Sequence, residues 1–397
     1  MPFDLLRCAT GRPRWAWLHA DTAWVGLGVW AQVSAQGAQR FQKLQRVGRH
    51  WGNAPGPQGP AFVGFGFTPG DHHRPPWWQA FPAGLLVLPE EVHGPIPLDP
   101  GDAPDAPEVD AVPEKVAGTT QEAWREAVEA ALTAIAQERL HKVVLARAEV
   151  RRFPAAPDPV AVLEALYRRH PDAYCFLYEP TPGVAFVGAS PELLARVGPK
   201  GRLATAALAG TAPRGATPQE DAVLGKALLQ SDKDRREHAL VVEAIRRALE
   251  PLTLALEVPA SPGLRRLPQV QHLETPIQGT LRTGVGLLQV AEALHPTPAL
   301  GGMPRGAALR FIARHEPIPR GWYAAPLGIL FPDGTGELAV GIRSALLLGE
   351  RVVLYAGAGI VAGSDPEREW DETALKMATM REALAEAERL AVGSFDG

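Results

Sequence analysis

The chain of 397 residues has little of what builds cross-links, zinc sites or membrane spans. Its two cysteines, Cys8 and Cys175, exclude a disulfide framework, and no Cys/His spacing is typical of a zinc site. No run of about 18 apolar residues occurs, so we expect no membrane-spanning helix. The first residues lack the basic and apolar regions of a signal peptide, and we expect a cytoplasmic protein.

Lysine is also scarce, because arginine supplies most of the positive charge and there are seven lysines. The net charge of -4 does not indicate a basic surface for nucleic acid. The content of 46% hydrophobic residues allows a large core. A lysine between apolar residues is therefore conspicuous. Lys142 occupies such a place in the strand-like run 141–147, although an edge or surface position is an equal alternative for this residue alone.

Proline and glycine divide the chain into three parts. Residues 1–96 are rich in Trp, Gly and Pro, and their short strand-like pieces at 61–65 and 84–88 carry no catalytic pattern. The stretch 97–118 is dense in Pro, Asp and Ala, which predicts a surface linker or loop. Residues 119–393 form the third part, which holds the candidate functional residues.

The third part alternates blocks of strands with blocks of helices. Thr119 and Glu122 form a capping box that predicts a helix over 119–140, directly before the strand of Lys142. Short strands separated by Pro/Gly turns predict an antiparallel meander. The expected strands are 174–178, 184–188, 193–197, 202–207, 338–346 and 351–356, and the expected helices are 218–229, 231–249 and a long one from about 364. This grouping favours an α+β fold with large antiparallel sheets.

Acidic helices provide candidate metal ligands. Glu369, Glu372 and Lys376 are spaced i, i+3, i+7 and share one helix face, and Glu237 lies on a different helix. Each segment taken alone also fits an ordinary solvated charged face. Two glutamates from separate helices suit Mg²⁺, which prefers oxygen ligands and keeps positions for water and an anionic substrate.

Two glycine-containing segments, 208–215 and 356–363, predict loops whose N–H groups bind an anion. Plain turns are the alternative. Neither has the spacing of a P-loop or a dinucleotide-binding motif, so a nucleotide site is not expected. Arg343, expected in a strand, suits a bidentate carboxylate contact or a structural ion pair.

Several longer strings, taken in order, carry a family resemblance. They are KVVLAR, FVGASPELL, LAGTAPRG, SDKDRREHALVVEAI, QHLETPIQGTL, HPTPALGGMPR, GWYAAPLGIL, AVGIRSALL and YAGAGIVAGSDPEREWDETALKM. With them, residues of about 115–393 resemble the chorismate-utilising enzymes, which include isochorismate, anthranilate, aminodeoxychorismate and salicylate synthases. The resemblance implies a sandwich of large antiparallel sheets with helices packed outside, which residues 1–96 complete.

Two alanines indicate which member of the family this sequence resembles. Aminodeoxychorismate synthases carry a nucleophilic lysine at the position of Ala209. Anthranilate and salicylate synthases usually carry threonine at the position of Ala299, whereas a small apolar residue there is the pattern of isochorismate synthases. The resemblance therefore favours isochorismate synthase, which uses water as nucleophile. A salicylate synthase, an aminating subunit and a chorismate-binding protein without turnover stay open as alternatives.

The resemblance also implies catalytic roles. Lys142 is the expected general base that takes a proton from the attacking water, which requires the neutral amine at working pH. Glu192 is the expected general acid that protonates the leaving 4-hydroxyl, which requires a raised carboxyl pKa. The two groups are expected on opposite faces of the ring.

The same resemblance implies ligands for metal and substrate. Glu237 and Glu372 are expected to bind Mg²⁺, with Glu369 beside them. Gly210, Thr211 and Lys376 are expected at the ring carboxylate, Tyr323, Arg343, Gly357 and Gly359 at the enolpyruvyl carboxylate, and His272, Ala299 and Leu300 along the wall. A structural role is the alternative for His272. We expect chorismate as the partner, a monomer with a weak dimer as the alternative, and use of the product for menaquinone, with siderophore synthesis as the other pathway.

Overall fold

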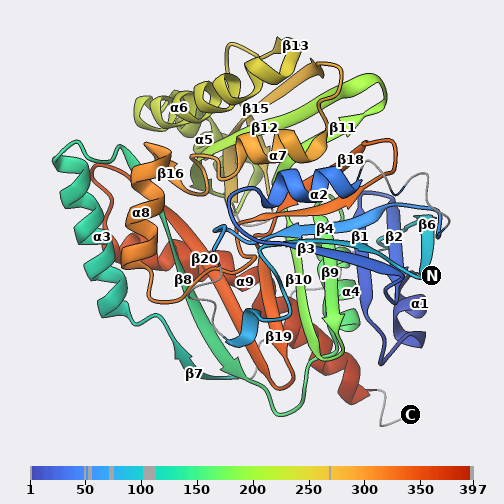
Figure 1. Ribbon diagram of the computed structural model, residues 1–397. Helices are drawn as coiled ribbons and strands as arrows, with labels where there is room; N and C mark the ends of the chain where they lie inside the picture. The colour runs from blue at the N-terminus through green and yellow to red at the C-terminus, as the bar shows by residue number, and fades with distance from the viewer. Residues whose placement is uncertain are drawn as a thin grey trace.

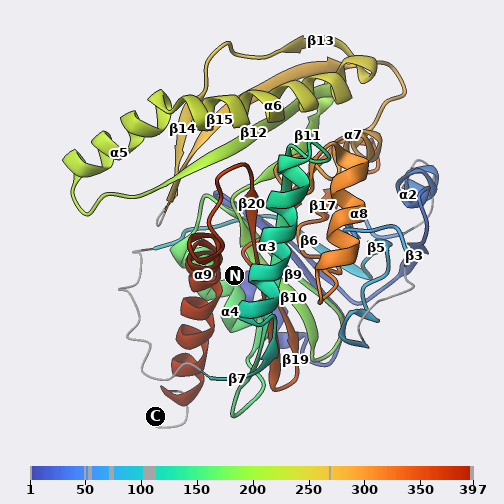
Figure 2. The same ribbon diagram turned by 90° about the vertical axis from the view of Figure 1, so that its left-hand side faces the viewer.

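The computed structural model describes residues 2–48, 51, 56–70, 76–101, 113–267 and 270–393. In these residues two large sheets, each of ten strands, pack against each other and carry helices on their outer sides (Figures 1 and 2). All the strand pairs recorded in them are antiparallel. The expected α+β sandwich is confirmed.

The first sheet mixes strands from both ends of the chain. Its order is β16 (Gly302–Met303), β8 (Lys142–Arg152), β20 (Arg351–Ile360), β19 (Ser344–Leu348), β10 (Val184–Ser190), β9 (Tyr174–Thr181), β1 (Arg14–His19), β2 (Thr22–Leu27) and β6 (Glu91–Pro97). The short strand β7 (Glu114–Gly118) pairs with β8, so the end of the expected linker is part of the sheet.

The second sheet is built in the same mixed way. Its order is β13 (Thr253–Glu257), β15 (Val270–Leu281), β12 (Arg202–Pro213), β11 (Leu193–Gly198), β18 (Gly336–Val340), β17 (Pro326–Leu330), β4 (Ala61–Phe65), β5 (Gly84–Leu88) and β3 (Ala31–Ala35), and β14 (Gly263–Arg266) pairs with β15. Segments of residues 1–96 thus add strands to both sheets.

Helices cover the outer faces of both sheets (Figure 2). The first sheet carries α1 (Pro2–Cys8), α4 (Pro159–Arg169) and α9 (Pro366–Gly393), and the second carries α2 (Arg40–Gly48), α5 (Pro218–Gln230), α6 (Asp232–Leu249) and α7 (Leu287–Leu294). The two helices α3 (Gln121–Ala136) and α8 (Arg305–His315) contact β8. Among the described residues no helix is long and apolar enough to cross a membrane.

Aromatic side chains fill the space between the two sheets. Trp15, Phe62, Tyr178 and Trp322 are fully buried there, and the Tyr178 ring packs edge-on against the other three. The hydroxyl of Tyr178, on β9, hydrogen-bonds to backbone carbonyls of β4 and β17 in the opposite sheet, with the shorter contact of 2.6 Å to Gly328. A buried hydroxyl needs such a partner, and here the partner links the sheets.

The N-terminus of α3 differs from the expected one. Thr120, one residue after the expected cap, accepts a hydrogen bond from the N–H of Ala123. The hydroxyl of Thr119 instead accepts from the N–H of Ala148 on β8. The expected Thr119–Glu122 capping box was therefore wrong. The Thr119 hydroxyl bonds to β8 of the first sheet and does not cap the helix.

The strands lie at the expected positions, but the prediction that they form one meander was wrong. The four strands expected as one meander are β9, β10, β11 and β12, but the chain passes from the first sheet to the second between β10 and β11. The single strand expected over 338–346 is two, β18 and β19, interrupted at residues 341–343. Local periodicity predicts a strand but carries no information about which sheet accepts it.

Replacing Tyr178 with Phe should destabilise the fold while preserving its shape. The change removes a buried hydroxyl that bridges the sheets, and we expect a loss of about 1 kcal/mol of unfolding free energy. The midpoint of urea unfolding, followed by circular dichroism, measures this. An unchanged midpoint would show that the inter-sheet hydrogen bonds add nothing to stability.

Candidate active site

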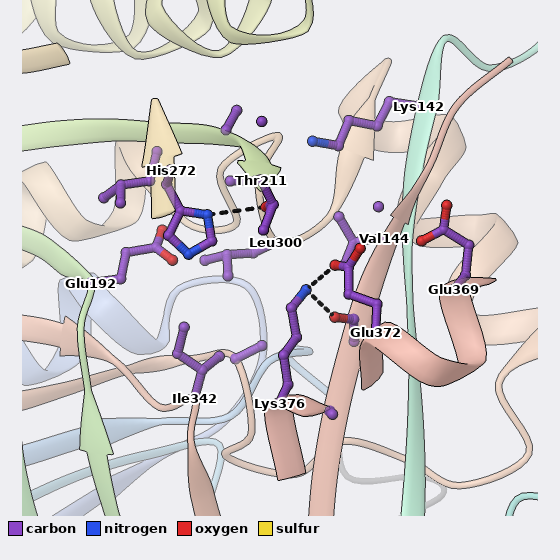
Figure 3. Close-up of a pocket in the computed structure, with 18 of the residues that line it drawn as sticks. Lys142, Val144, Glu192, Thr211, His272, Leu300, Ile342, Glu369, Glu372 and Lys376 are labelled. Atoms are coloured by element: carbon purple, nitrogen blue, oxygen red, sulfur yellow. Dashed lines mark hydrogen bonds and ion pairs between the residues drawn. The ribbon is translucent and has the colours of Figure 1, made fainter. Parts of the chain in front are cut away.

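A cavity of about 270 Å³ lies between β8 and β20 of the first sheet and β12 and β15 of the second, with α6 and α9 at its side. Every site residue expected from the sequence lines it. These are Lys142, Glu192, Gly210, Thr211, Glu237, His272, Ala299, Leu300, Tyr323, Arg343, Gly357, Gly359, Glu369, Glu372 and Lys376. Figure 3 shows Lys142, Glu192 and Lys376 among them. Residues up to 234 positions apart in the sequence (376 − 142) thus converge on one space.

Lys142 is the first residue of β8 and is buried, with 7% of its surface exposed. Its Nζ forms an ion pair of 2.6 Å with Glu237 of α6. On the neighbouring strand a Cβ added to Gly359 would lie 3.0 Å from the Cε of Lys142. Glycine at 359 therefore leaves the lysine room to reach across the strand.

Glu192 lies at the point where the chain crosses from one sheet to the other, between β10 and β11. Its N–H donates to the Ser190 hydroxyl at 3.2 Å, and its carbonyl accepts from Val340 at 3.0 Å, so the crossing is anchored at both ends. In Figure 3 its carboxyl group enters the cavity from the side away from Lys142. Burial raises the pKa of Glu192 to about 7, against the opposing attraction of Lys142 and Lys376.

A bulge in β12 shapes the opposite wall. The register with β15 shifts between Ala209 and Thr211, and Gly210 at the bulge has φ of 78°. The segment 208–215 was expected as a loop, but residues 208–213 belong to β12, and the bulge alone breaks its ladder. Thr211 and His272 face each other across the two strands, with 3.0 Å between Oγ1 and Nδ1.

His272 is electrically neutral at physiological pH. Burial, together with the cations Lys376 and Arg343, lowers its pKa to about 4. The ring therefore serves as a hydrogen-bonding wall beside Thr211 and contributes no charge to the cavity.

Glu369, Glu372 and Lys376 were predicted to share one face of a helix. All three lie on α9 and line the cavity. Asp365 caps this helix by accepting from the N–H groups of Glu367 and Arg368. Burial and the neighbouring Glu372 raise the pKa of Glu369. Burial alone would also raise the pKa of Glu372, but Lys376 outweighs it and the pKa lies below its usual range.

Lys376 connects this row to β20. Its Nζ donates to the Gly357 carbonyl at 2.9 Å and pairs with Glu372, as the dashed lines of Figure 3 show. Gly357 and Gly359 were expected in a loop, yet both belong to β20. A Cβ at Gly357 would lie 3.4 Å from the Tyr323 hydroxyl, so glycine here gives close approach within a strand.

Arg343 was expected in a strand and lies instead in the break between β18 and β19, with φ of 50°. No ion pair or side-chain hydrogen bond holds its guanidinium within the described residues. Burial lowers its pKa from the usual arginine value. A buried cation without a protein partner is unfavourable, and an anionic ligand would stabilise it.

Beneath the cavity a buried ion pair holds the walls together. Arg320 binds Glu316 and also donates to the carbonyls of Leu300 at 2.9 Å and Val144 at 2.7 Å. Glu316 in turn accepts from the N–H of Ala146 at 2.8 Å. The pair thus fixes β8 relative to the segment that carries Ala299 and Leu300.

Sequence reasoning missed several lining residues. They are Val144, Pro191, Leu208, Lys233, Asp234, Arg320, Ala324, Ile342, Tyr355, Ala356, Val361 and Ser364. The strand period of two could have found Val144, which shares a face with Lys142. The spacing of Glu316 and Arg320 permits a local ion pair, but no local pattern identifies the other partners of Arg320, which are backbone carbonyls of distant segments.

The pKa of Glu192 should rise further when Lys376 is replaced with Met, because a cation that favours the carboxylate is lost. The carboxyl stretching band in infrared spectra, titrated with pH, measures this, and Glu192→Gln identifies the band. Lys226→Met, a change at an exposed lysine of α5 outside the cavity, is the control. A wild-type value near the ordinary glutamate value of about 4.3 would contradict the assignment.

Comparisons with known proteins agree with this geometry. The family model described as chorismate binding enzyme matches residues 101–385. The salicylate biosynthesis isochorismate synthase of Pseudomonas aeruginosa is 50% identical over 273 residues, which are 69% of this chain and 56% of that protein. Isochorismate synthase MenF of Bacillus subtilis is 41% identical over 262 residues, which are 66% of this chain and 55% of that protein. The chain thus aligns with a little over half the length of these two relatives.

A solved structure extends the likeness over the rest of the chain. The menaquinone-specific isochorismate synthase MenF of Escherichia coli superposes with a TM-score of 0.80 at 30% identity, covering 97% of this chain and 91% of that one. The sequence strings, the antiparallel sandwich and the matching family model lead to the same conclusion: the chain belongs to the chorismate binding enzyme family.

Proposed function

We propose that this protein is an isochorismate synthase, which converts chorismate reversibly to isochorismate by adding water at C2 and releasing the 4-hydroxyl. The observation that carries the proposal is a carboxyl group with a pKa of about 7, Glu192, which faces a buried lysine across the cavity. Relatives at 50% and 41% identity bear the name isochorismate synthase, which supports the same reaction.

The charges of the cavity suit a substrate with two carboxylates. Arg343 forms no ion pair within the described residues, and Tyr323, Gly357 and Gly359 line the same cavity; we assign these four to the enolpyruvyl carboxylate. We assign Gly210, Thr211 and Lys376 to the ring carboxylate. Arginine favours a planar, bidentate carboxylate contact, so Arg343 would also orient the ligand.

Acid and base act from different sides in this proposal. With a pKa of about 7, Glu192 is protonated in about half of the molecules at neutral pH, and the protonated form delivers its proton to the departing 4-hydroxyl. Lys142 accepts the proton of the attacking water and must be neutral to do so. Its Nζ contacts Glu237 at 2.6 Å, so this contact must open before Lys142 can reach the attacking water.

We propose Mg²⁺ as the metal, held by Glu237 and Glu372 with Glu369 beside them. Within the described residues no three His, Cys, Asp or Glu side chains form a ready-made cluster. The donors nevertheless fit, because all are carboxylates on one cavity and Glu372 raises the pKa of Glu369, a repulsion that a cation would relieve. The bound ion would neutralise the ring carboxylate and withdraw electron density from the ring.

The choice of water as nucleophile rests on two small side chains. Ala209 and Ala299 line the cavity and bring no amine or hydroxyl to it. A covalent lysine mechanism is thereby disfavoured, and ammonia has no hydrogen-bonding partner from these two positions. We also propose that one chain forms a complete site, since all the assigned residues come from a single chain.

The use of the product follows from the relatives alone. One solved relative is named menaquinone-specific and one curated relative is named for salicylate biosynthesis. We propose the menaquinone pathway as the use of isochorismate here. A salicylate synthase, which goes on to release pyruvate, is the second candidate because the relative with 50% identity is named for that product.

Product analysis tests the proposal directly. Purified protein should convert chorismate with Mg²⁺ to isochorismate, identified by chromatography, and ammonium should change nothing. Removing the metal with a chelator should stop the reaction. Salicylate with pyruvate would establish the second candidate, and anthranilate formed only with ammonium would establish an aminating enzyme.

Lys142→Ala should abolish isochorismate formation, with a loss of at least about 100-fold in turnover, because the general base is removed. Lys226→Ala, an exposed lysine of α5, should keep normal turnover. Unchanged circular dichroism spectra would establish that both variants fold. Near-normal turnover of Lys142→Ala would contradict the role of Lys142 as base.

A further inference from the structure

A cluster of charged side chains lies around Glu149 of β8, outside the proposed active site. The Glu149 carboxylate accepts hydrogen bonds of 2.8 Å from two arginines of the same strand and one of α9. These are Arg147, Arg151 and Arg381. Burial would raise the pKa of Glu149, but the three arginines outweigh it and lower the pKa to about 2. Glu149 is therefore an anion at neutral pH and joins the strand to the helix. None of these four residues lines the cavity of the active site.

Arg147 reaches beyond this cluster to the N-terminal part of α9. Its side chain is buried, and its Nε donates to the hydroxyl of Thr373 at 2.6 Å. Its guanidinium carbon lies 3.7 Å from the centre of the Trp370 ring. Arginine can donate hydrogen bonds in the guanidinium plane and stack that plane on an aromatic ring, and Arg147 does both. One side chain of β8 thus holds two residues of α9.

The two residues that Arg147 contacts are neighbours of the proposed metal ligands. Trp370 directly follows Glu369, and Thr373 directly follows Glu372. The Thr373 hydroxyl also donates to the Trp370 carbonyl at 2.6 Å, which links the two contacts. Successive residues lie about 100° apart around a helix axis, so any rotation of the helix moves both faces together. Fixing Trp370 and Thr373 therefore fixes the direction in which the two glutamates point.

The same face of α9 is held a second time, by α3. Nε1 of Trp124 donates to the carbonyl of Pro366, the first residue of α9, at 3.0 Å. The ring of Trp124 also meets that of Trp370 nearly edge to face, with 6.3 Å between the ring centres. Pro366, Trp370 and Thr373 are spaced i, i+4, i+7 and share one helix face. Contacts along this face restrict both the position and the rotation of the N-terminal part of α9.

The strand β8 also carries Lys142, the proposed base, five positions before Arg147. Its pairing with β20 runs without a register shift from Val143 to Arg152, so alternate side chains point to opposite faces of the sheet. Lys142 lines the cavity and contacts Glu237, whereas Arg147 points to the other face and contacts α9. One strand thus relates the proposed base to the helix of the proposed metal ligands.

We propose that Arg147 is a positioning residue for the metal site. Through Thr373 and Trp370 it fixes the direction in which Glu372 and Glu369 enter the cavity. The inference rests on the proposed function, because that function makes Glu372 a ligand of Mg²⁺ with Glu369 beside it. Outer groups that orient metal ligands change the affinity for the metal without touching it. Arg147 acts in this way, since it does not line the cavity.

The test measures binding of Mg²⁺ alone, without chorismate, by isothermal titration calorimetry. Thr373→Val keeps a similar side-chain volume and removes the hydroxyl that contacts Arg147 and Trp370, whereas Thr373→Ser keeps a hydroxyl there. Arg147→Lys, a second variant, keeps a cation beside Glu149 and removes the planar group. The matched control is Thr379→Val, the same change at another buried threonine of α9 that does not line the active-site cavity.

We expect Thr373→Val and Arg147→Lys to weaken Mg²⁺ binding about tenfold, the lower end of the effect of outer-shell groups. Thr373→Ser and Thr379→Val should stay within about twofold of the wild type, well below the effect expected of an outer-shell group. A variant that is merely unstable would lower the number of binding sites per protein and leave the affinity of each site unchanged. The affinity therefore reports the positions of the ligands.

Equal affinities of the wild type, Thr373→Val and Arg147→Lys would overturn the role of Arg147 and leave the proposed function standing. An equal loss in Thr379→Val would also overturn it, because that change does not touch the contact with Arg147. A wild-type protein that binds no Mg²⁺ in this titration would overturn the inference as well, and product analysis with chorismate then shows whether the proposed function fails with it.

Discussion

The buried ion pair between Arg320 and Glu316 is the interaction on which the geometry of the site depends. Both side chains are at most 5% exposed, and between them they bind three backbone groups that border the cavity. On one edge of β8 the neighbouring strands pair only with residues 142–143 and 149–152, so no strand on that edge satisfies the backbone groups of Val144 and Ala146. Removal of one partner would leave a buried charge and unpaired backbone groups, which is costly. The positions of Lys142 and Leu300 relative to each other follow from this one pair.

The cavity itself is made from irregularities of two otherwise regular sheets. Gly210 creates a bulge in one strand, and Glu192 and Arg343 lie on two crossings between the sheets, β10 to β11 and β18 to β19. A regular strand directs alternate side chains to opposite faces and saturates its backbone groups. Polar groups can therefore converge only where that pattern fails, and the sandwich supplies the rigid surroundings that hold them.

Sequence reasoning named residues that converge on one cavity, but it did not predict the backbone around them. Lys142 and the row on α9 were predictable, because motif and helical spacing are local properties. The segments around Gly210 and Gly357 were expected as loops, whereas their glycines serve strands that approach Asp234 and Tyr323 closely. The role of Arg320 could not be predicted, since the carbonyls of Leu300 and Val144 are brought to it only by the completed fold. Local patterns predict elements well and predict long-range contacts poorly.

Among the described side chains of the cavity, charges of both signs are left unbalanced. Lys142 and Lys376 have glutamate partners, but Arg343 has none within the described residues and calls for an anion. Burial and the neighbouring Glu372 raise the pKa of Glu369, and the two carboxyl groups would be stabilised by a cation. A dianionic substrate together with a divalent metal would satisfy both needs at once. Because each charge would stabilise the other, binding of the metal and binding of the substrate should be mutually favourable.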